Sequence, residues 1–374
     1  MQESDPRSPS ADFQPASVPA LGWGEFSYAP PRSRSGARRT RRHPVIAALL
    51  CSVLLSACSG WQSALDPRGP EAQKLADLFW VFFGISVVVW LLVTAALVWA
   101  IVRRRPQRPD PLASDEARER RIGRVIAGCV AATGAVVIAL TILSYFAQQG
   151  LSATLGNALT ISVAGHQWWW EVRYDDPEPG RVFLTANEIH VPIGQPVVVK
   201  LETRDVIHSF WIPSLAGKMD QINNHPNALQ FTASRAGVYR GQCAEFCGQQ
   251  HAKMAFFVVA SPPEEFAAWR RKQIEPATSP RDPLRAAGLH VFLSRSCMAC
   301  HTIRGTTAGG QAGPDLTHLA SRRSIAAGTL PLTSGHLAAW IVDPQHVKPG
   351  AQMPSTPLSG AELNALVAYL MGLE

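Results

Sequence analysis

The chain has 374 residues, of which 47% are hydrophobic and only 17% are charged, and its formal net charge is +7. That length accommodates about two to three ordinary domains. The low charged fraction suits a protein that lies partly in lipid. The positive charge does not indicate nucleic-acid binding, because it gathers beside apolar runs, where arginine sets membrane orientation. The two basic clusters are Arg32, Arg34, Arg38, Arg39, Arg41 and Arg42, and Arg103, Arg104, Arg105, Arg108, Arg118, Arg120 and Arg121.

The cysteines exclude a disulfide-based fold. Four of the seven form two close pairs, and the other three lie in or beside apolar runs, which is not the spacing of a disulfide framework. The pairs are Cys243 with Cys247 and Cys297 with Cys300; the others are Cys51, Cys58 and Cys129.

The N-terminal region has the composition of a tail followed by a secretion signal. Residues 1–43 are rich in Pro, Ser and Arg without apolar periodicity, which predicts a disordered basic tail. Residues 44–58, PVIAALLCSVLLSAC, are too short to span a bilayer but have the charged start and apolar centre of a signal peptide. Their end, LSAC, resembles the bacterial lipobox, which makes Cys58 a candidate lipidated N-terminus. Two alternatives stay open: an uncleaved anchor helix, and a translation start further along the chain.

Two long apolar runs predict a membrane hairpin. Residues 76–102 and 122–146 are each about the length that a transmembrane helix requires. A buried helix of a soluble protein is the alternative for each run, but an arginine-rich loop between them argues against it. The excess of Arg in residues 103–121 places this loop in the cytoplasm and both chain ends outside.

The pattern then changes to short β-prone stretches separated by turn residues. Residues 155–262 contain no long amphipathic helix, which predicts an antiparallel sandwich or barrel. Residues 263–283 form a linker, with a short helix at PEEFAAWRRKQ. Residues 284–374 are helical again. The last helix carries a capping box at Ser359 and Glu362 and a single apolar face, made of Leu363, Leu366, Val367 and Leu370.

Residues 241–254, GQCAEFCGQQHAKM, combine the soft ligands Cys243, Cys247, His251 and Met254. A disulfide would leave the histidine and methionine unexplained, and a zinc site would not select methionine. Copper suits thiolate, imidazole and thioether together. Because a mononuclear blue copper site needs one cysteine and two histidines, the second cysteine indicates two metals bridged by two thiolates.

A further histidine must come from elsewhere in the β region. His208, in DVIHSFWIP, is the strongest candidate, because it ends a β stretch and has aromatic neighbours. His190 and His166 compete with it on spacing alone.

The C-terminal region carries an attachment motif for a c-type haem. Cys297-Met298-Ala299-Cys300-His301 is CxxCH, in which both thiols bind the haem covalently and the histidine ligates the iron. Met353 precedes a proline in an extended loop and is the expected second iron ligand. Ligation by histidine and methionine together raises the reduction potential of the haem. Met371 and Met298 fit worse, because one lies in the last helix and the other inside the motif.

Three segments in chain order, GHQWWWEVRY, DVIHSFWIPSLAGKMD and GQCAEFCGQQHAKM, resemble subunit II of the haem–copper cytochrome c oxidases over residues 70–262. The resemblance implies a cupredoxin Greek-key barrel. It implies that the side-chain ligands of a dinuclear mixed-valence copper centre, Cu-A, are His208, Cys243, Cys247, His251 and Met254. It further implies that Glu245 gives copper its backbone carbonyl and directs its carboxylate toward Mg²⁺ at the interface with subunit I.

The same resemblance makes Trp168 the residue at which electrons from cytochrome c arrive. Two positions depart from the family pattern. Trp169 stands where most members have Tyr, and Ile222-Asn223-Asn224-His225 replaces the usual Ile-Pro-Gly-Arg turn. The interfacial role of that arginine is therefore in doubt in this chain.

Residues 284–374 resemble the class I cytochrome c domain that is fused to subunit II in caa-type oxidases. In Gly313-Pro314-Asp315-Leu316 the proline carbonyl is implied to orient the haem-ligating histidine. Trp340 is expected to pack on the haem edge.

Together these features predict the electron-transfer subunit of a cytochrome c oxidase, multi-pass in the bacterial inner membrane, with its copper and haem domains on the periplasmic face. The expected partners are subunits I and III and an external donor, cytochrome c or another carrier; oxygen reduction and proton translocation belong to subunit I. Glu116 or Glu119 could feed a proton channel or form solvated ion pairs. The alternatives are the equivalent subunit of a copper-containing nitric oxide reductase and a copper-binding or delivery protein. A quinol oxidase subunit is contradicted by Cys243 and Cys247.

Overall fold

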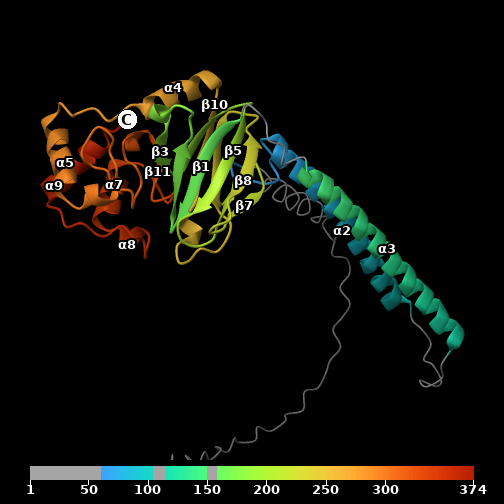
Figure 1. Cartoon of the computed structure of the whole chain (residues 1–374). Helices are drawn as coiled ribbons and strands as arrows, with labels where there is room; N and C mark the ends of the chain where they lie inside the picture. The colour runs from blue at the N-terminus through green and yellow to red at the C-terminus, as the bar shows by residue number, and fades with distance from the viewer. Residues whose placement is uncertain (1–59, 104–114, 150–157) are drawn as a thin grey trace, which may run out of the picture. The chain divides into compact units, whose positions relative to one another are not determined.

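The computed structural model describes residues 60–103, 115–149 and 158–374. Two long helices, α2 (Pro70–Val102) and α3 (Glu116–Gln149), contact each other along their length (Figure 1). Their large apolar side chains are exposed, for example Trp90 at 65% and Leu92 at 66%. Helices of this length and apolar exposure are suited to lipid. The predicted N-terminal tail and signal peptide lie outside the described residues.

Helix α2 begins six residues before the predicted span, at Pro70. The reason is that its polar first turn packs on the β domain. Glu71 is buried, and its carboxylate accepts a hydrogen bond of 3.0 Å from the backbone N–H of Thr232. The backbone of Arg68, two residues before the helix, continues this contact with the β domain. Arg68 N–H donates to Ser214 O at 2.7 Å, and Ser234 N–H donates to Arg68 O at 2.8 Å.

Helix α3 begins at Glu116, so the end of the predicted loop is helical. Glu116 and Glu119 lie in its first turn, where carboxylates are favoured by the helix dipole. Glu116 forms an exposed ion pair of 3.1 Å with Arg120, one turn along. Glu116 therefore stabilises the N-terminus of the helix, and its exposed ion pair contributes little to stability.

The β domain consists of two five-stranded sheets (Figure 1). The strands are β1 (Leu159–His166), β2 (Trp169–Tyr174), β3 (Phe183–Ala186), β4 (Glu188–Pro192), β5 (Pro196–Thr203), β6 (His208–Trp211), β7 (Lys218–Gln221), β8 (Asn227–Thr232), β9 (Gly237–Cys243) and β10 (Ala255–Ser261). The sheet orders are β3-β2-β1-β5-β8 and β4-β10-β9-β6-β7. Pairing is antiparallel except for β1 with β5 and β10 with β4, which are parallel because the chain crosses between the sheets before returning.

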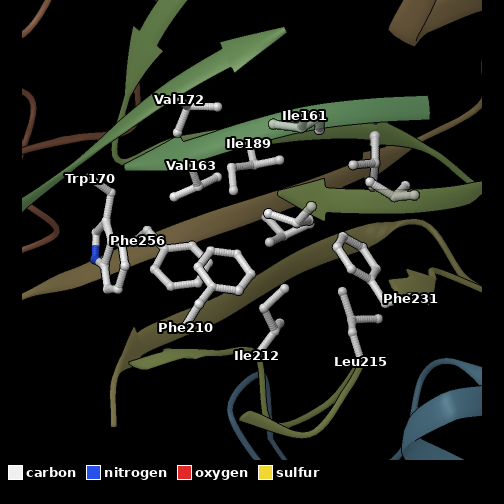
Figure 2. Close-up of a cluster of buried hydrophobic side chains, with 14 of the residues drawn as sticks. Ile161, Val163, Trp170, Val172, Ile189, Phe210, Ile212, Leu215, Phe231 and Phe256 are labelled. Carbon is white, nitrogen blue, oxygen red and sulfur yellow. The ribbon is translucent and has the colours of Figure 1, made fainter. Parts of the chain in front are cut away.

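The core lies between the two sheets, where alternate residues of each strand point inward. Figure 2 shows Val163 and Ile189 among aromatic side chains contributed by both sheets. Trp170 meets Phe210 and Phe256 edge-on, with ring centroids 5.7 and 5.3 Å apart. This cupredoxin-like core fixes the strand ends on which the expected metal ligands lie.

Short helices build the C-terminal domain: α5 (Pro283–Ser294), α6 (Cys297–Cys300), α7 (Ser334–Val342), α8 (Pro344–Val347) and α9 (Gly360–Leu370), with a small hairpin of β11 (Ser324–Ile325) and β12 (Leu330–Pro331). Helix α4 (Pro263–Ile274) precedes them, in the predicted linker. The capping box predicted at Ser359 and Glu362 is confirmed. Helices α5 and α9 pack closely, and Leu366, Val367 and Leu370 are buried in the domain core.

Gly288 permits the close approach of α5 to α9. A Cβ atom there would lie 2.0 Å from the carbonyl oxygen of Ala365 and 2.7 Å from Cβ of Tyr369. We therefore expect Gly288→Ala to destabilise this domain by about 2 kcal/mol or more, because backbone must move to admit the methyl group. For a domain of this size the midpoint should fall by roughly 10 °C in calorimetry of the full chain in detergent.

Gly335→Ala is the matched control, because Gly335 lies in α7 with nothing within 4 Å of the added methyl group. Its midpoint should stay unchanged or rise slightly, since alanine favours helix by up to about 1 kcal/mol. Equal midpoints for the two variants would contradict the close-packing argument.

Candidate metal centre and haem site

The predicted copper ligands of the β domain meet where three neighbouring strands end. His208 opens β6, Cys243 ends β9, and Met254 directly precedes β10. The backbone N–H of Cys243 donates to Met254 O at 2.9 Å, which closes the base of the intervening loop. Pairing of Phe210 with Cys243 aligns β6 with β9 and brings His208 beside the loop.

The side chains form a compact group of soft donors. Sγ of Cys243 lies 3.7 Å from Sγ of Cys247 and 3.8 Å from Nδ1 of His208. Sγ of Cys247 in turn lies 3.6 Å from Nδ1 of His251 and 3.7 Å from Sδ of Met254. The carbonyl oxygen of Glu245 is 3.1 Å from Sγ of Cys243. All six predicted donors are thus brought together.

The two thiols are free and buried, and they lie within hydrogen-bond distance of each other. Their mutual hydrogen bond lowers the pKa of Cys243 well below that of an ordinary thiol and raises the pKa of Cys247. The lowered pKa favours the thiolate form of Cys243, which is the form that binds metal.

Asp205 orients His208 and was not predicted from the sequence. Its Oδ1 lies 2.8 Å from Nε2 of His208, which turns Nδ1 toward the thiols. Burial lowers the pKa of His208, but hydrogen bonds to Cys243 and Asp205 outweigh it and raise that pKa. The signal available was the spacing Asp205-x-x-His208, since ligating histidines usually place their other nitrogen on a carboxylate or carbonyl.

The two competing histidines, His190 and His166, pack against other side chains. Nε2 of His190 lies 2.8 Å from Oε1 of Glu188, and its ring stacks on Trp269. His166 stacks on Trp169 at 4.3 Å, and burial lowers its pKa to about 4. Among the described residues, the group of metal-ligating side chains within 4.8 Å of one another is His208, Cys243 and Cys247.

The three adjacent tryptophans have different environments. Trp170 lies in the core, Trp169 on His166, and Trp168 in the turn before β2. Nε1 of Trp168 donates to the carbonyl oxygen of Cys247 at 2.9 Å. The predicted electron-receiving residue therefore contacts the ligand loop directly.

The turn that departs from the family pattern closes with a bridge between Ile222 and His225. Nδ2 of Asn223 donates to Asp205 O at 2.9 Å, so the turn supports the segment that orients His208. Nearby, the carboxylate of Glu245 is half-exposed and lies 4.0 Å from Nζ of Lys218.

The haem site lies in the C-terminal domain. Cys297 and Cys300 are free thiols on α6, and the next residue, His301, leaves the helix. Nδ1 of His301 lies 2.8 Å from the carbonyl oxygen of Pro314, as the resemblance implied. Burial lowers the pKa of His301, and the hydrogen bond at Nδ1 leaves Nε2 for a metal.

Met353 lies in an extended loop and packs against the domain core, as Trp340 does. Its carbonyl oxygen accepts a hydrogen bond of 3.1 Å from Nε2 of Gln345. Met298 and Met371 also pack at the edge of this core. The choice of Met353 as iron ligand stays a prediction.

Both donor sets fit the groups that the sequence implies. Two thiols, two imidazole Nδ1 atoms, a thioether and a backbone carbonyl form the donor chemistry of a thiolate-bridged copper pair. Paired thiols followed by a histidine whose Nδ1 is already hydrogen-bonded fit a c-type haem.

Comparison with known proteins gives matches for both domains. The family described as "Cytochrome C oxidase subunit II, periplasmic domain" matches residues 177–261, and the family described as "Cytochrome c" matches residues 286–374. Cytochrome c oxidase subunit 2 of Alkalihalophilus pseudofirmus is 33% identical over 337 residues, which are 86% of this chain and 94% of the relative. That of Bacillus subtilis is 29% identical over 349 residues, 88% and 97% of the two chains. The solved periplasmic domain of subunit II from Bradyrhizobium japonicum has 30% identity and a TM-score of 0.31, and covers 32% of this chain and 96% of its own.

We expect Asp205→Ala to lower copper affinity by about 10- to 100-fold, because His208 loses the carboxylate that fixes its ring. Asp205→Asn keeps an acceptor and should lose less. Competition titration with a copper chelator measures the affinities in the full chain.

Glu202→Ala removes an exposed carboxylate from β5 and is the matched control. It should leave copper affinity unchanged. If Asp205→Ala behaved in the same way, Asp205 would have no part in the centre.

Proposed function

Because the chain belongs to the cytochrome c oxidase subunit II family, we propose that it is the electron-transfer subunit of a respiratory terminal oxidase. It accepts electrons at a c-type haem and delivers them through a Cu-A centre to subunit I, where oxygen is reduced to water and protons are translocated. The observation that carries the proposal is the meeting of His208, Cys243 and Cys247 at one point, in a chain that also bears a cytochrome c domain.

The Cu-A ligands proposed are His208, Cys243, Cys247, His251 and Met254, with the carbonyl oxygen of Glu245. Met254 and His208 are fully buried, which excludes water from the site. When bound, the copper pair supplies an electron carrier whose charge is shared by both metals. The rigid strand ends that bear its ligands favour small rearrangement on reduction.

For the haem we propose covalent attachment at Cys297 and Cys300 and axial ligation by His301 and Met353. His301 is held in orientation by Pro314, whose carbonyl accepts from Nδ1. The Met353 loop is tied to α8 through Gln345, which donates to Ala351 O at 2.7 Å and to Met353 O. These contacts support a fixed ligand geometry.

The external donor, cytochrome c or another carrier, is proposed to bind the haem domain rather than Trp168. The exposed fraction of Trp168 is only 9%, because the C-terminal domain of the same chain covers it. A soluble donor therefore meets the haem domain first, and Trp168 receives electrons from within the chain.

Subunit I is proposed to cover the apolar surface at the mouth of the copper centre, and subunit III to complete the complex. Phe246, between the two cysteines, is 76% exposed. Val206 and Ile207, which directly precede the ligand His208, and Ile222, beside the Asn223 that bonds to Asp205, are also exposed. Exposed apolar groups beside a buried site are typical of an interface. Glu245 is the one carboxylate proposed for Mg²⁺, so the remaining ligands would come from subunit I.

We place the chain as a multi-pass protein of the bacterial inner membrane, with α2 and α3 as its spans. Cys58 remains a proposed lipidation site, as the new N-terminus left by cleavage of the signal peptide between Ala57 and Cys58. The two electron-transfer domains then lie on the periplasmic face, where a soluble donor reaches them.

The test is the optical and electron paramagnetic resonance spectrum of the full-length protein purified in detergent. We expect a delocalised two-copper signal together with a low-spin c-type haem. A mononuclear copper signal, or haem without copper, would overturn the proposal.

Cys247→Ser should abolish the two-copper signal and leave the haem spectrum unchanged, because it removes a bridging thiolate. Cys129→Ser is the matched control, since Cys129 lies on the exposed surface of α3. It should keep both signals.

A further inference from the structure

The haem domain and the β domain are joined by specific hydrogen bonds. Ala255 N–H donates to Ala327 O at 3.0 Å, and Arg323 N–H donates to Oε2 of Glu188 at 2.9 Å. The end of α8 and the loop that follows it make a second set. Nε2 of Gln250 donates to Pro349 O at 2.8 Å, and Lys253 donates to Val347 O at 2.6 Å.

Lys348, at the C-terminal end of α8, is the more deeply buried of the two ionisable side chains, Lys348 and Glu188, that lie buried in this interface. Its exposed fraction is 3%. Nζ donates to Trp168 O at 2.6 Å, Lys253 O at 2.8 Å and Ala326 O at 3.2 Å. An ammonium group has three donors, so its capacity is fully used.

The acceptors come from three separate segments. Trp168 lies in the turn before β2, Lys253 in the copper-ligand loop, and Ala326 between β11 and β12. Among the described residues, no carboxylate pairs with Lys348. A buried lysine without an ion pair is unfavourable unless its hydrogen bonds are satisfied, so these three contacts are what stabilise it in place.

Two contacts of the same loop determine where Trp168 lies. Lys348 holds its carbonyl oxygen, and Gly350 lies against its indole ring, since a Cβ atom there would be 3.4 Å from Cη2. Gly350 has φ of +85°, a conformation that glycine adopts readily. On its other side the indole N–H binds Cys247 O. Trp168 is thus held between the loop that leads to Met353 and the loop that bears Cys247.

We propose that Lys348 is a positioning residue for electron transfer within this chain: it fixes the Met353 loop against Trp168 and so sets the rate from haem to copper. This inference rests on the proposed function. It assigns Lys348 no contact with either metal, so its removal should change the transfer rate and the docking of the domains without changing either reduction potential.

The experiment compares Lys348→Met with the wild-type full chain in detergent. Methionine keeps the length and apolar character of the stem and removes the three hydrogen bonds. Laser-flash reduction of the haem should show transfer to copper slowed at least several-fold, because the rate of electron tunnelling falls steeply as the two centres separate, and loss of the three hydrogen bonds lets the Met353 loop move away from Trp168. Hydrogen exchange should be faster at the amides of Ala255 and Arg323, which donate across the interface.

Lys272→Met is the matched control, because Lys272 is exposed on α4. Lys348→Gln, which retains a neutral donor, provides a second variant in the event that Lys348→Met does not fold. The proposal is overturned if both Lys348 variants match Lys272→Met in the rate of haem-to-copper electron transfer and in hydrogen exchange at Ala255 and Arg323. It is also overturned if they shift the reduction potential of the haem or of the copper centre. Absence of haem-to-copper transfer in the wild type would instead refute the proposed function.

Discussion

The pairing of β9 with its two neighbours is the constraint on which the copper centre depends. β6 on one side positions His208, and β10 on the other returns the chain so that Met254 lies beside Cys243. The ligand loop between Cys243 and Met254 is closed at its base by one backbone hydrogen bond. Because His208, Cys243 and Met254 lie at strand ends, and the loop that bears Cys247 and His251 is closed at its base, the donors converge with little conformational entropy left to lose on binding a metal.

Local spacing made much of this arrangement predictable. The ligand loop, the CxxCH motif and the capping box at Ser359 each depend on residues close in sequence, so their patterns were readable directly. The two-sheet domain and its cupredoxin-like fold followed from short β-prone stretches and from family resemblance. His208 was preferred to His190 and His166 because it was expected to end a β stretch and has aromatic neighbours. The structure places it at the start of β6 instead, and still with the thiols.

Contacts between distant segments could not be predicted in the same way. The two parallel strand pairs, the packing of Glu71 on Thr232 and the burial of Lys348 all join residues more than twenty positions apart. A lysine in a polar loop has the sequence pattern of a solvated side chain. Only the folded chain brings Trp168 O, Lys253 O and Ala326 O around it.

The packing of α2 on the β domain has a mechanical consequence. Hydrogen bonds at Arg68 and Glu71 fasten the helix to the barrel without an intervening stalk. Because these bonds join the first turn of α2 directly to the barrel, the depth of α2 in the bilayer and the position of the barrel are linked. The height of the copper centre above the lipid therefore depends on how deeply this helix lies in the membrane.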